Sequence, residues 1–503
     1  MKVSFITVDE AHCISQWGYD FRPSYLQIAE IRRVKPDAPV LALTATATRR
    51  VMDDIMERLQ FREKKVFRMS FKRDNLAYVV REALDKYAEL LHILKSVEGS
   101  AIIYTRSRRR SKVVSEWLEQ QGVSATFYHA GLEPAIKDER QKLWQTDKKR
   151  VMAATNAFGM GIDKPNVRLV IHLDCPDSVE AYFQEAGRAG RDGKKAYAIL
   201  LWNGHDHAVL AKRIKTTFPS KEIVRDVYDH LAYFFQVGLG SGNGHTFTFN
   251  IDQFCYIYHF YPLYVNSALH ILQSAGYIEY ETDPDARARL RFLLGRDELY
   301  KLYETTPNEE AVISALLRNY SGLFSDYRYV EEALISQVSG LSQNEVYLIL
   351  KSLSHRRILH FIPQRKTPFI TYTQDRIDGC DVVIPASVYD QRKEQFIKHV
   401  NAIEAYATNN HVCRSRQLLR YFDETKSEDC GICDVCVDHQ PNPNAEQEFK
   451  DAKQAILDLL ADHKPHDIKE TSELLLPRKA FKEALKYLCN EELVHIDGLM
   501  IYR

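Results

Sequence analysis

Short apolar runs alternate with amphipathic stretches through the first 205 residues of the chain. Five runs rich in β-branched and aromatic residues predict strands near 101–104, 125–129, 151–154, 167–173 and 197–201. Helical patterns lie between these runs, and the alternation predicts a parallel sheet covered by helices. Earlier runs at 4–9, 40–45 and 65–69 predict an incomplete first sheet, and residues 70–86 are expected to link the two sheets.

The pattern changes after residue 205. Three segments each carry an amphipathic helix, a break and a short β run, which is typical of a winged-helix domain. Each copy fits either DNA contact through its basic residues or packing alone, and both interpretations stay open. The expected domains are a remnant of a first α/β lobe at 1–75, a complete second lobe at 76–205, winged-helix-like domains at 206–304, 305–390 and 441–503, and a helical, cysteine-rich module at 391–440.

Composition says more about the cellular compartment of the protein than about its binding partner. The 503 residues hold 68 Lys and Arg against 68 Asp and Glu, so net charge gives no support for nucleic-acid binding and any DNA contact must use local patches. No apolar stretch approaches the roughly eighteen residues of a membrane span, and residues 1–3 begin a strand instead of a signal peptide. Nine cysteines, four of them clustered, favour a reducing compartment and a metal site. We therefore expect a cytoplasmic protein without a membrane partner.

Two adjacent carboxylates end the first apolar run. Asp9 and Glu10 follow Val3–Val8 and should emerge at the carboxyl end of a parallel strand, where open α/β sheets bind ligands. An aspartate in that place can hold a phosphate-bridging Mg²⁺, and a neighbouring glutamate can orient and deprotonate an attacking water. The pattern therefore predicts a site for nucleotide hydrolysis.

The loop after the carboxylates is rich in aromatic and cationic residues. Trp17, Tyr19, Phe21 and Arg22 form a set suited to stacking on unpaired bases. A motor that consumes nucleotide while it holds single-stranded nucleic acid needs both chemistries, physically coupled. We expect the loop to supply the DNA-sensing half of such a motor.

Two further strand ends carry small hydroxyl residues or cations. Thr44 and Thr46 could bridge the carboxylates to a neighbouring lobe, although a Thr-Ala-Thr run is also common at ordinary strand ends. Thr105, Arg106 and Ser107 offer hydroxyls and a cation to a phosphate backbone. The alternative for this second segment is a solvated helix start.

The segment 154–165 is more specific. Gly159 and Gly161 allow close backbone approach to a phosphate or a ribose. Asp163 can accept a hydrogen bond from a ribose or from a partner arginine, and Thr155 can reach a DNA phosphate.

The segment 184–193 supplies two arginines. Arg188 and Arg191 are three residues apart and are expected on one face of a helix, with small residues between them. Two guanidinium groups on one face suit the charge that develops on a transferring γ-phosphoryl group. The alternative is an ion-pair face without a catalytic role, which the carboxylate pair upstream makes less attractive.

In order and spacing, residues 9–23, 154–165 and 184–193 closely resemble the RecQ family of ATP-dependent DNA helicases, over residues 1 to about 205. The resemblance implies an α/β fold of RecA-like helicase lobes, the first incomplete and the second complete, followed by winged-helix-like α+β domains and a small zinc module. It also implies a 3′-to-5′ motor that uses ATP with Mg²⁺ on single-stranded DNA and duplex junctions, in recombination and repair, near a bacterial nucleoid. The resemblance and the residues discussed above together give a catalytic set of Asp9, Glu10, His12, Gln184, Arg188 and Arg191, nucleotide contacts at Gly161 and Asp163, and DNA contacts at Trp17, Phe21, Arg22, Thr105, Arg106, Ser107 and Thr155. Within the catalytic set, Asp9 would serve Mg²⁺, Glu10 would activate water and Arg191 would be the arginine finger. Tyr19 stands where many members of the family carry histidine.

One essential motif is absent from the sequence. A phosphate loop needs Gly-x-x-x-x-Gly-Lys-[Ser/Thr], and none of the 21 glycines is followed by Lys-Ser or Lys-Thr. Since the family places this loop upstream of the carboxylates, we expect an N-terminally truncated chain that binds ATP poorly and hydrolyses little or none. The alternative is a DNA-binding protein stabilised by zinc and without ATPase activity. An RNA helicase is disfavoured by the Trp17 loop together with the cysteine cluster.

That cluster consists of four cysteines in a short stretch. Sixteen residues separate Cys413 from Cys430, and two residues separate each of the next pairs, Cys430 to Cys433 and Cys433 to Cys436. Four thiolates at this spacing predict tetrahedral Zn²⁺ in a structural role, because no coordination position stays open. Disulfides and an iron–sulfur cluster are the alternatives. RecQ helicases carry a similar zinc module, which supports the resemblance.

Overall fold

A computed structural model describes residues 3–15, 17–159, 162–281, 288–299, 305–324, 327–363, 368–440, 443–467, 477–497 and 500–503. The chain divides into two compact units, which are described separately. The first unit is Met1–Ile214 with Arg392–Arg503, and the second is Lys215–Gln391.

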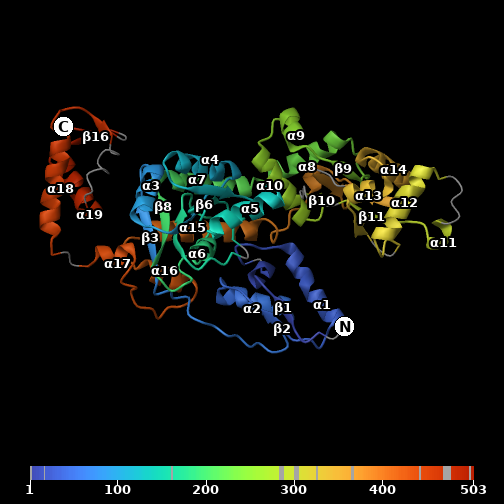
Figure 1. The fold of residues 1–503 in the computed structure, drawn as a ribbon, viewed down its shortest axis with the longest axis horizontal. Coiled ribbons are helices and arrows are strands. Elements are labelled where there is room, and N and C mark those ends of the chain that lie inside the picture. Colours follow the sequence, from blue (N-terminus) through green and yellow to red (C-terminus); the bar gives the residue numbers. More distant parts are fainter. Residues whose placement is uncertain are drawn as a thin grey trace. The chain divides into compact units, whose positions relative to one another are not determined.

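A six-stranded parallel sheet is the centre of the first unit (Figure 1). Its order is β3-β8-β7-β4-β6-β5. The strands are β3 (Leu76–Glu82), β4 (Ser100–Tyr104), β5 (Ala125–Tyr128), β6 (Val151–Ala154), β7 (Val167–His172) and β8 (Ala196–Trp202). The five predicted strands of this lobe are confirmed. The prediction of a linker at 70–86 is wrong in part, because the apolar residues from Leu76 onward form an edge strand that pairs with β8 over seven residues.

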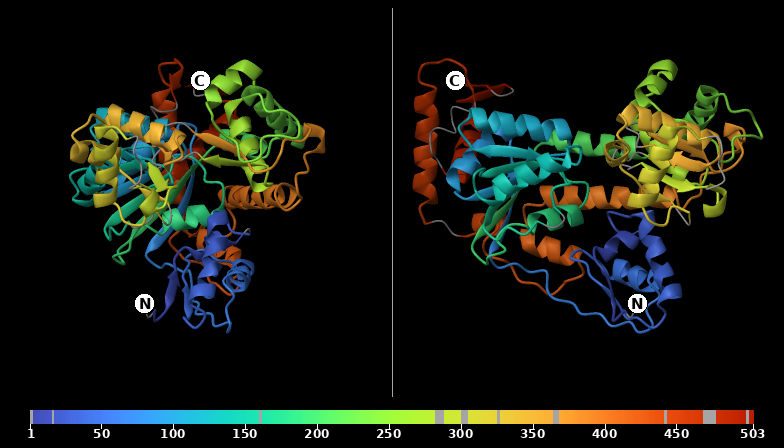
Figure 2. Two further views of the ribbon diagram at one scale, coloured as in Figure 1. Left: turned by 90° about the vertical axis from the view of Figure 1, so that its right-hand side faces the viewer. Right: turned by 45° about the vertical axis from the view of Figure 1, so that its right-hand side comes forward.

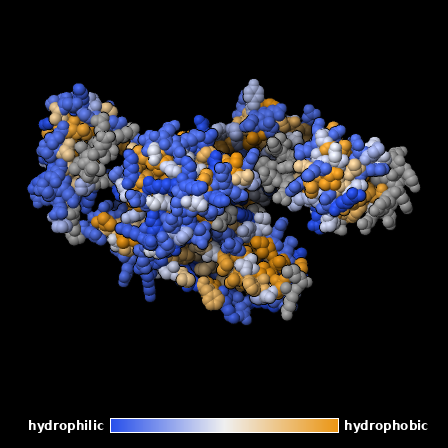
Figure 3. All heavy atoms as spheres, viewed as in Figure 1, coloured by the Kyte–Doolittle hydropathy of each residue, from blue (hydrophilic) through white to orange (hydrophobic). Residues whose placement is uncertain are grey.

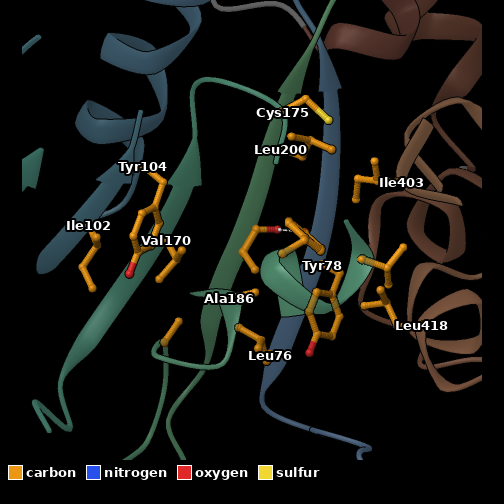
Figure 4. Packing of buried hydrophobic residues seen from close by; sticks show 14 of the residues in the cluster. Leu76, Tyr78, Ile102, Tyr104, Val170, Cys175, Ala186, Leu200, Ile403 and Leu418 are labelled. Carbon is orange, nitrogen blue, oxygen red and sulfur yellow. Dashed lines mark hydrogen bonds between the residues drawn. The ribbon is translucent and has the colours of Figure 1, made fainter. Parts of the chain in front are cut away.

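Side chains of successive residues enter opposite faces of this sheet, as strand geometry requires. In β4, Ala101 and Ile103 belong to one buried cluster, whereas Ile102 and Tyr104 belong to the other. Helices α3 (Lys86–Ser96) and α4 (Arg108–Gln120) cover the first face. The second face is covered by α5 (Pro134–Gln145), α6 (Val179–Ala186), α7 (Gly204–Thr217), α15 (Asp390–Thr408) and α16 (Arg414–Tyr421). Figure 2 shows helices on both sides of the sheet, and Figure 4 shows Leu418 beside Tyr78, with Ile403 nearer the level of Leu200.

The first-lobe segment is small. Its strands β1 (Ile6–Val8) and β2 (Val40–Ala42) are parallel neighbours. Its helices are η1 (Ala11–Ile14), η2 (Pro23–Glu30), α1 (Ile31–Val34) and α2 (Arg49–Arg58). The strand predicted at 65–69 is wrong: this stretch has no regular secondary structure and pairs with no strand among the described residues, and Phe67 is 93% exposed. Hydrophobic residues lie on the surface of this segment (Figure 3), including Phe5, Leu41 and Leu43.

The second unit contains two helix-and-sheet domains. One has helices α8 (Lys221–Phe235), α9 (Ile251–Tyr258) and α10 (Pro262–Ser274), the turn η3 (Gly379–Asp381), and strands β9 (Thr246–Thr248), β10 (Ile278–Glu281) and β14 (Phe369–Tyr372). The other has α11 (Arg296–Leu299), α12 (Pro307–Asn319), α13 (Glu332–Ser339), α14 (Gln343–His355), β11 (Arg289–Phe292), β12 (Arg328–Tyr329) and β13 (Leu359–Ile362). Strand pairing crosses the division expected at residues 304 and 305, because β11 pairs with β13 and β14 returns to β10. The second domain is therefore an insertion between two strands of the first.

The rest of the first unit follows α15 and α16. A short helix α17 (Asp434–Asp438) ends the cysteine-rich module. The C-terminal elements are α18 (Ala445–Leu459), β15 (His466–Asp467), α19 (Arg478–Asn490), β16 (His495–Asp497) and β17 (Met500–Tyr502). The three strands form an antiparallel sheet beside the two helices, in keeping with the expected helix and wing. Among the described helices, none has the length and apolarity needed to cross a lipid bilayer.

Candidate functional site

The carboxylates of Asp9 and Glu10 lie where β1 ends, and the backbone of Glu10 is strained. Glu10 adopts a left-handed conformation with φ 47° and ψ 43°, which a non-glycine residue rarely occupies. This turn directs the chain into η1 and lets the Glu10 N–H donate to Asp9 Oδ1 at 2.8 Å. Such strain is often found at functional sites, where the surrounding structure maintains it.

Side chains from three parts of the chain surround the Glu10 carboxylate. The Gln184 Nε2 atom donates to Glu10 Oε1 at 3.3 Å, and His12 Nδ1 lies 3.3 Å from Glu10 Oε2. Thr44 Oγ1 lies 3.0 Å from the same His12 nitrogen, so Thr44 reaches the carboxylate through the histidine ring. Burial and then the charge of Asp9 raise the pKa of Glu10, and the Arg188 guanidinium offsets part of this. Burial lowers the pKa of His12, which favours a neutral ring.

The two arginines lie in turns instead of on a helix. The prediction of a shared helix face is wrong, because α6 ends at Ala186 and Gly190 takes a φ of 63° in the following turns. Arg188 is buried and donates to the Gly159 carbonyl at 2.5 Å. Arg191 donates to Asp163 Oδ1 at 3.0 Å and to the Ile162 carbonyl at 3.1 Å.

Gly159 makes room for Arg188. A Cβ added at Gly159 would lie 2.4 Å from Arg188 Nη2, so no other residue fits there without displacing the guanidinium group. Its small size was predicted to serve a phosphate or a ribose, whereas the structure shows it packed against an arginine. Gly161, the other predicted nucleotide contact of this segment, lies outside the described residues.

An open cavity of about 1070 Å³ brings the carboxylate and the arginines together. Its lining includes Glu10, Thr44, Thr46, Gly159, Asp163, Gln184, Arg188 and Arg191. This volume is at the upper end for small-molecule sites and is ample for a nucleoside triphosphate. The donor set suits such a ligand, because carboxylate oxygens bind Mg²⁺ and guanidinium groups bind phosphate.

The aromatic loop touches this site through one tyrosine. The Tyr19 hydroxyl donates to Gln184 Oε1 at 2.6 Å, and its ring stacks on His12 with centroids 5.0 Å apart. Tyr19 therefore contacts two residues that also contact Glu10. Arg22 pairs with Asp20 at 2.7 Å, which closes the loop on itself. The contact between Tyr19 and Gln184 was not predicted, because the two residues are 165 positions apart.

A second cavity of about 480 Å³ joins predicted DNA contacts to the same residues. Arg22, Thr105 and Arg106 line it together with Glu10, His12, Tyr19, Gln184 and Arg188. Arg106 pairs with Asp177, and its backbone N–H donates to Asp174. The Ser107 hydroxyl accepts from the Arg110 N–H and caps α4, so this residue starts a helix. Thr155 is buried at the end of β6.

The four clustered cysteines converge as predicted. Their Sγ atoms all lie within 4.8 Å of one another. Backbone N–H groups donate to three sulfurs at 3.3–3.4 Å, from Cys430 to Cys413, from Cys433 to Cys430 and from Cys436 to Cys433. None of the nine cysteines, all of which the structure describes, forms a disulfide. The donor set fits a structural zinc ion held by Cys413, Cys430, Cys433 and Cys436.

An aspartate of this module contacts the large sheet and is held by an ion pair inside the module. Asp434, inside the last cysteine turn, accepts from the buried Arg414 side chain at 3.1 Å and from the Val80 N–H of β3 at 3.0 Å. Neither role was predicted. The sequence offered one sign of this role, an aspartate between two metal-binding cysteines, because a turn fixed by the metal would hold its side chain in place.

Known protein families match the segments of the chain that carry these features. Four protein-family models match: DEAD/DEAH box helicase over residues 1–55, helicase conserved C-terminal domain over 84–193, RecQ helicase winged-helix domain of Bacteroidota over 290–363, and RecQ zinc-binding over 373–437.

Individual relatives match over the motor region. The ATP-dependent DNA helicase RecQ of Pasteurella multocida is 44% identical over 225 residues, which are 44% of this chain and 36% of the relative. The RecQ-like DNA helicase blm-1 of Caenorhabditis elegans is 43% identical over 213 residues, 41% of this chain and 22% of the relative. The matched region thus spans about a third or less of these relatives' own length.

Proposed function

We propose that this chain, which belongs to the RecQ family of helicases, forms part of an ATP-driven motor that unwinds DNA in the 3′-to-5′ direction. The observation that carries the proposal is the series of contacts from Tyr19 through Gln184 to Glu10. These contacts join a loop suited to unpaired bases to a carboxylate suited to water activation. A motor needs such a connection, because hydrolysis must depend on bound DNA.

The carboxylates and arginines divide the work of hydrolysis. Asp9 is the residue we assign to Mg²⁺, and Glu10 accepts the proton of the attacking water, a task that its raised pKa favours. Arg188 and Arg191 stabilise the negative charge that develops on the transferred phosphoryl group. We assign the arginine finger to Arg191, because its partner Asp163 is 83% exposed on its side chain and can be exchanged for a phosphate.

The DNA side uses the second cavity and the aromatic loop. Trp17 and Phe21 would stack on bases, while Arg22 and Arg106 would exchange their aspartate partners for backbone phosphates. Thr105, Ser107 and Thr155 are assigned to backbone contacts in the same region. The substrate would be single-stranded DNA at duplex junctions, met during recombination and repair of the nucleoid DNA in a bacterial cytoplasm.

A second function is favoured by one feature of the sequence. The 503 residues hold no Gly-x-x-x-x-Gly-Lys-[Ser/Thr] motif, so nothing in this chain matches the loop that cradles β- and γ-phosphates. The chain by itself is therefore expected to turn over ATP slowly or not at all. It would then act as a zinc-stabilised DNA-binding protein.

Two measurements on the purified chain separate the two functions. The first is the affinity for a labelled single-stranded oligonucleotide, and the second is DNA-stimulated ATP turnover, each repeated with Glu10→Gln. The exposed Glu57 on α2 provides a matched control, Glu57→Gln. DNA binding together with turnover that only Glu10→Gln removes supports the motor. DNA binding without turnover, also in protein that contains a phosphate loop, supports the second function, and failure to bind DNA contradicts both.

A further inference from the structure

An arginine covers the tryptophan of the aromatic loop. The guanidinium carbon of Arg50, at the start of α2, lies 3.3 Å from the centroid of the Trp17 ring. Trp17 is partly buried and packs against the cluster of Val8, Ala11 and Val51 in the first-lobe segment. The guanidinium group therefore covers ring surface that the cluster leaves accessible.

The N–H groups of the Arg50 guanidinium are available for a ligand. Its side chain is exposed, and it forms no hydrogen bond or ion pair with any residue that the structure describes. The neighbouring arginine of the same helix differs, because Arg58 pairs with Asp54 at 3.2 Å. A guanidinium group whose contact is an aromatic face keeps its planar fork of N–H groups available for a phosphate.

We propose that Arg50 and Trp17 together form one binding site for a nucleotide of single-stranded DNA. In the DNA-bound state the indole ring stacks on a base, and the guanidinium group binds the adjacent phosphate. In the DNA-free chain the guanidinium group occupies the face of the ring that the base would use. This inference rests on the proposed function, because it adds a phosphate-binding residue to the DNA contacts assigned above.

The physical argument is an exchange of partners. A cation over an exposed aromatic ring is held weakly, whereas a hydrogen bond between a guanidinium group and a phosphate is charge-assisted and often bidentate. A base stacks on the released ring face without regard to sequence, since every base has a π-face. Single-stranded DNA therefore offers both residues a stronger partner than they offer each other.

The loop can carry this exchange to the hydrolysis site. The Trp17 N–H donates to Ser15 Oγ at 3.2 Å, and the Gly18 N–H donates to the Ser15 carbonyl at 3.1 Å. A Cβ at Gly18 would lie 2.8 Å from the His12 carbonyl oxygen, so the turn is tightly packed. Tyr19 follows directly and contacts Gln184, so the Trp17 ring and this contact lie two residues apart on one tightly packed turn.

The test measures the affinity of the full chain for fluorescently labelled oligothymidylate at several salt concentrations. The variants are Arg50→Met, Trp17→Ala, the double variant and Arg58→Met, which removes the same charge from the same helix. Each phosphate contact with a single strand contributes about 0.7 to the slope of log affinity against log salt. We expect Arg50→Met to lower the slope by about this amount, and to weaken binding about fivefold at 0.1 M salt.

Trp17→Ala should weaken binding without changing the slope, and the double variant should lose less than the two single losses combined. A wild-type slope in Arg50→Met, equal to that of Arg58→Met, would overturn the inference while leaving the proposed function intact. So would tighter binding with an unchanged slope, since Arg50 would then only cover the ring. A wild-type chain that binds no oligothymidylate overturns the proposed function as well.

Discussion

A buried ion pair within the cysteine module holds Asp434, which also accepts the Val80 N–H of the large sheet. Arg414 is 1% exposed, and its guanidinium group donates to Asp434, to the carbonyls of Tyr406 and Asn409, and to Asn410 Oδ1. The carboxylate of Asp434 is the anionic partner of this group among the described residues. Asp434→Ala would therefore leave a buried positive charge with neutral acceptors but without its anionic partner.

The expected loss of stability is large. Removing one partner of a buried ion pair costs about 3–5 kcal/mol, because the remaining charge stays desolvated. The substitution also removes the acceptor of the Val80 N–H, although this group lies on an edge strand and regains water in part. We expect the free energy of unfolding to fall by about 4 kcal/mol, against about 5–15 kcal/mol for a typical domain.

Urea unfolding of the zinc-loaded chain measures this loss, with Asp438→Ala as the control on the same short helix. Asp438 is exposed, so its removal should change the free energy of unfolding by less than about 0.5 kcal/mol. The double variant Arg414→Met with Asp434→Ala should recover part of the loss, because no charge is then left buried. Equal stability of Asp434→Ala and Asp438→Ala would refute the reasoning.

Four further outcomes are expected. In protein that also contains a phosphate loop, Glu10→Gln should abolish ATP turnover while DNA affinity stays within about twofold, and retained turnover would contradict the assigned base. Cys433→Ser should lose the zinc ion and cooperative unfolding, measured by metal analysis and calorimetry, whereas Cys380→Ser should keep both. Tyr19→Phe loses its hydrogen bond to the glutamine of α6, so DNA should stimulate turnover less while basal turnover persists; unchanged stimulation would count against the coupling. The pKa of Glu10, followed by NMR titration of its carboxyl carbon, should fall in Asp9→Asn but stay above the ordinary glutamate value, because burial is the larger cause. Because this pKa is raised, Glu10 becomes protonated at a higher pH than an ordinary glutamate when the solution is acidified. A pKa at or below the ordinary value would show that burial is not the cause.

The sequence predicted the parts of the fold that depend on local pattern. Alternating apolar runs and amphipathic stretches specify the strands of the parallel sheet, because side chains on both faces of a central strand must be apolar. The cysteine cluster could also be predicted from the sequence, because three of its four ligands lie within one short segment and their spacing is set by the backbone. The carboxylates could be placed at a strand end for the same local reason.

Tertiary structure decided which distant residues meet. The pairing of β14 with β10, and so the insertion of one domain into another, depends on which strand edges find each other over long separations. The turns that carry Arg188 and Arg191 depend on carbonyl groups of another segment, and the contact of Arg50 with Trp17 depends on how α2 packs on η1. Periodicity records which face of an element is buried, but it does not record the neighbour against which that face packs.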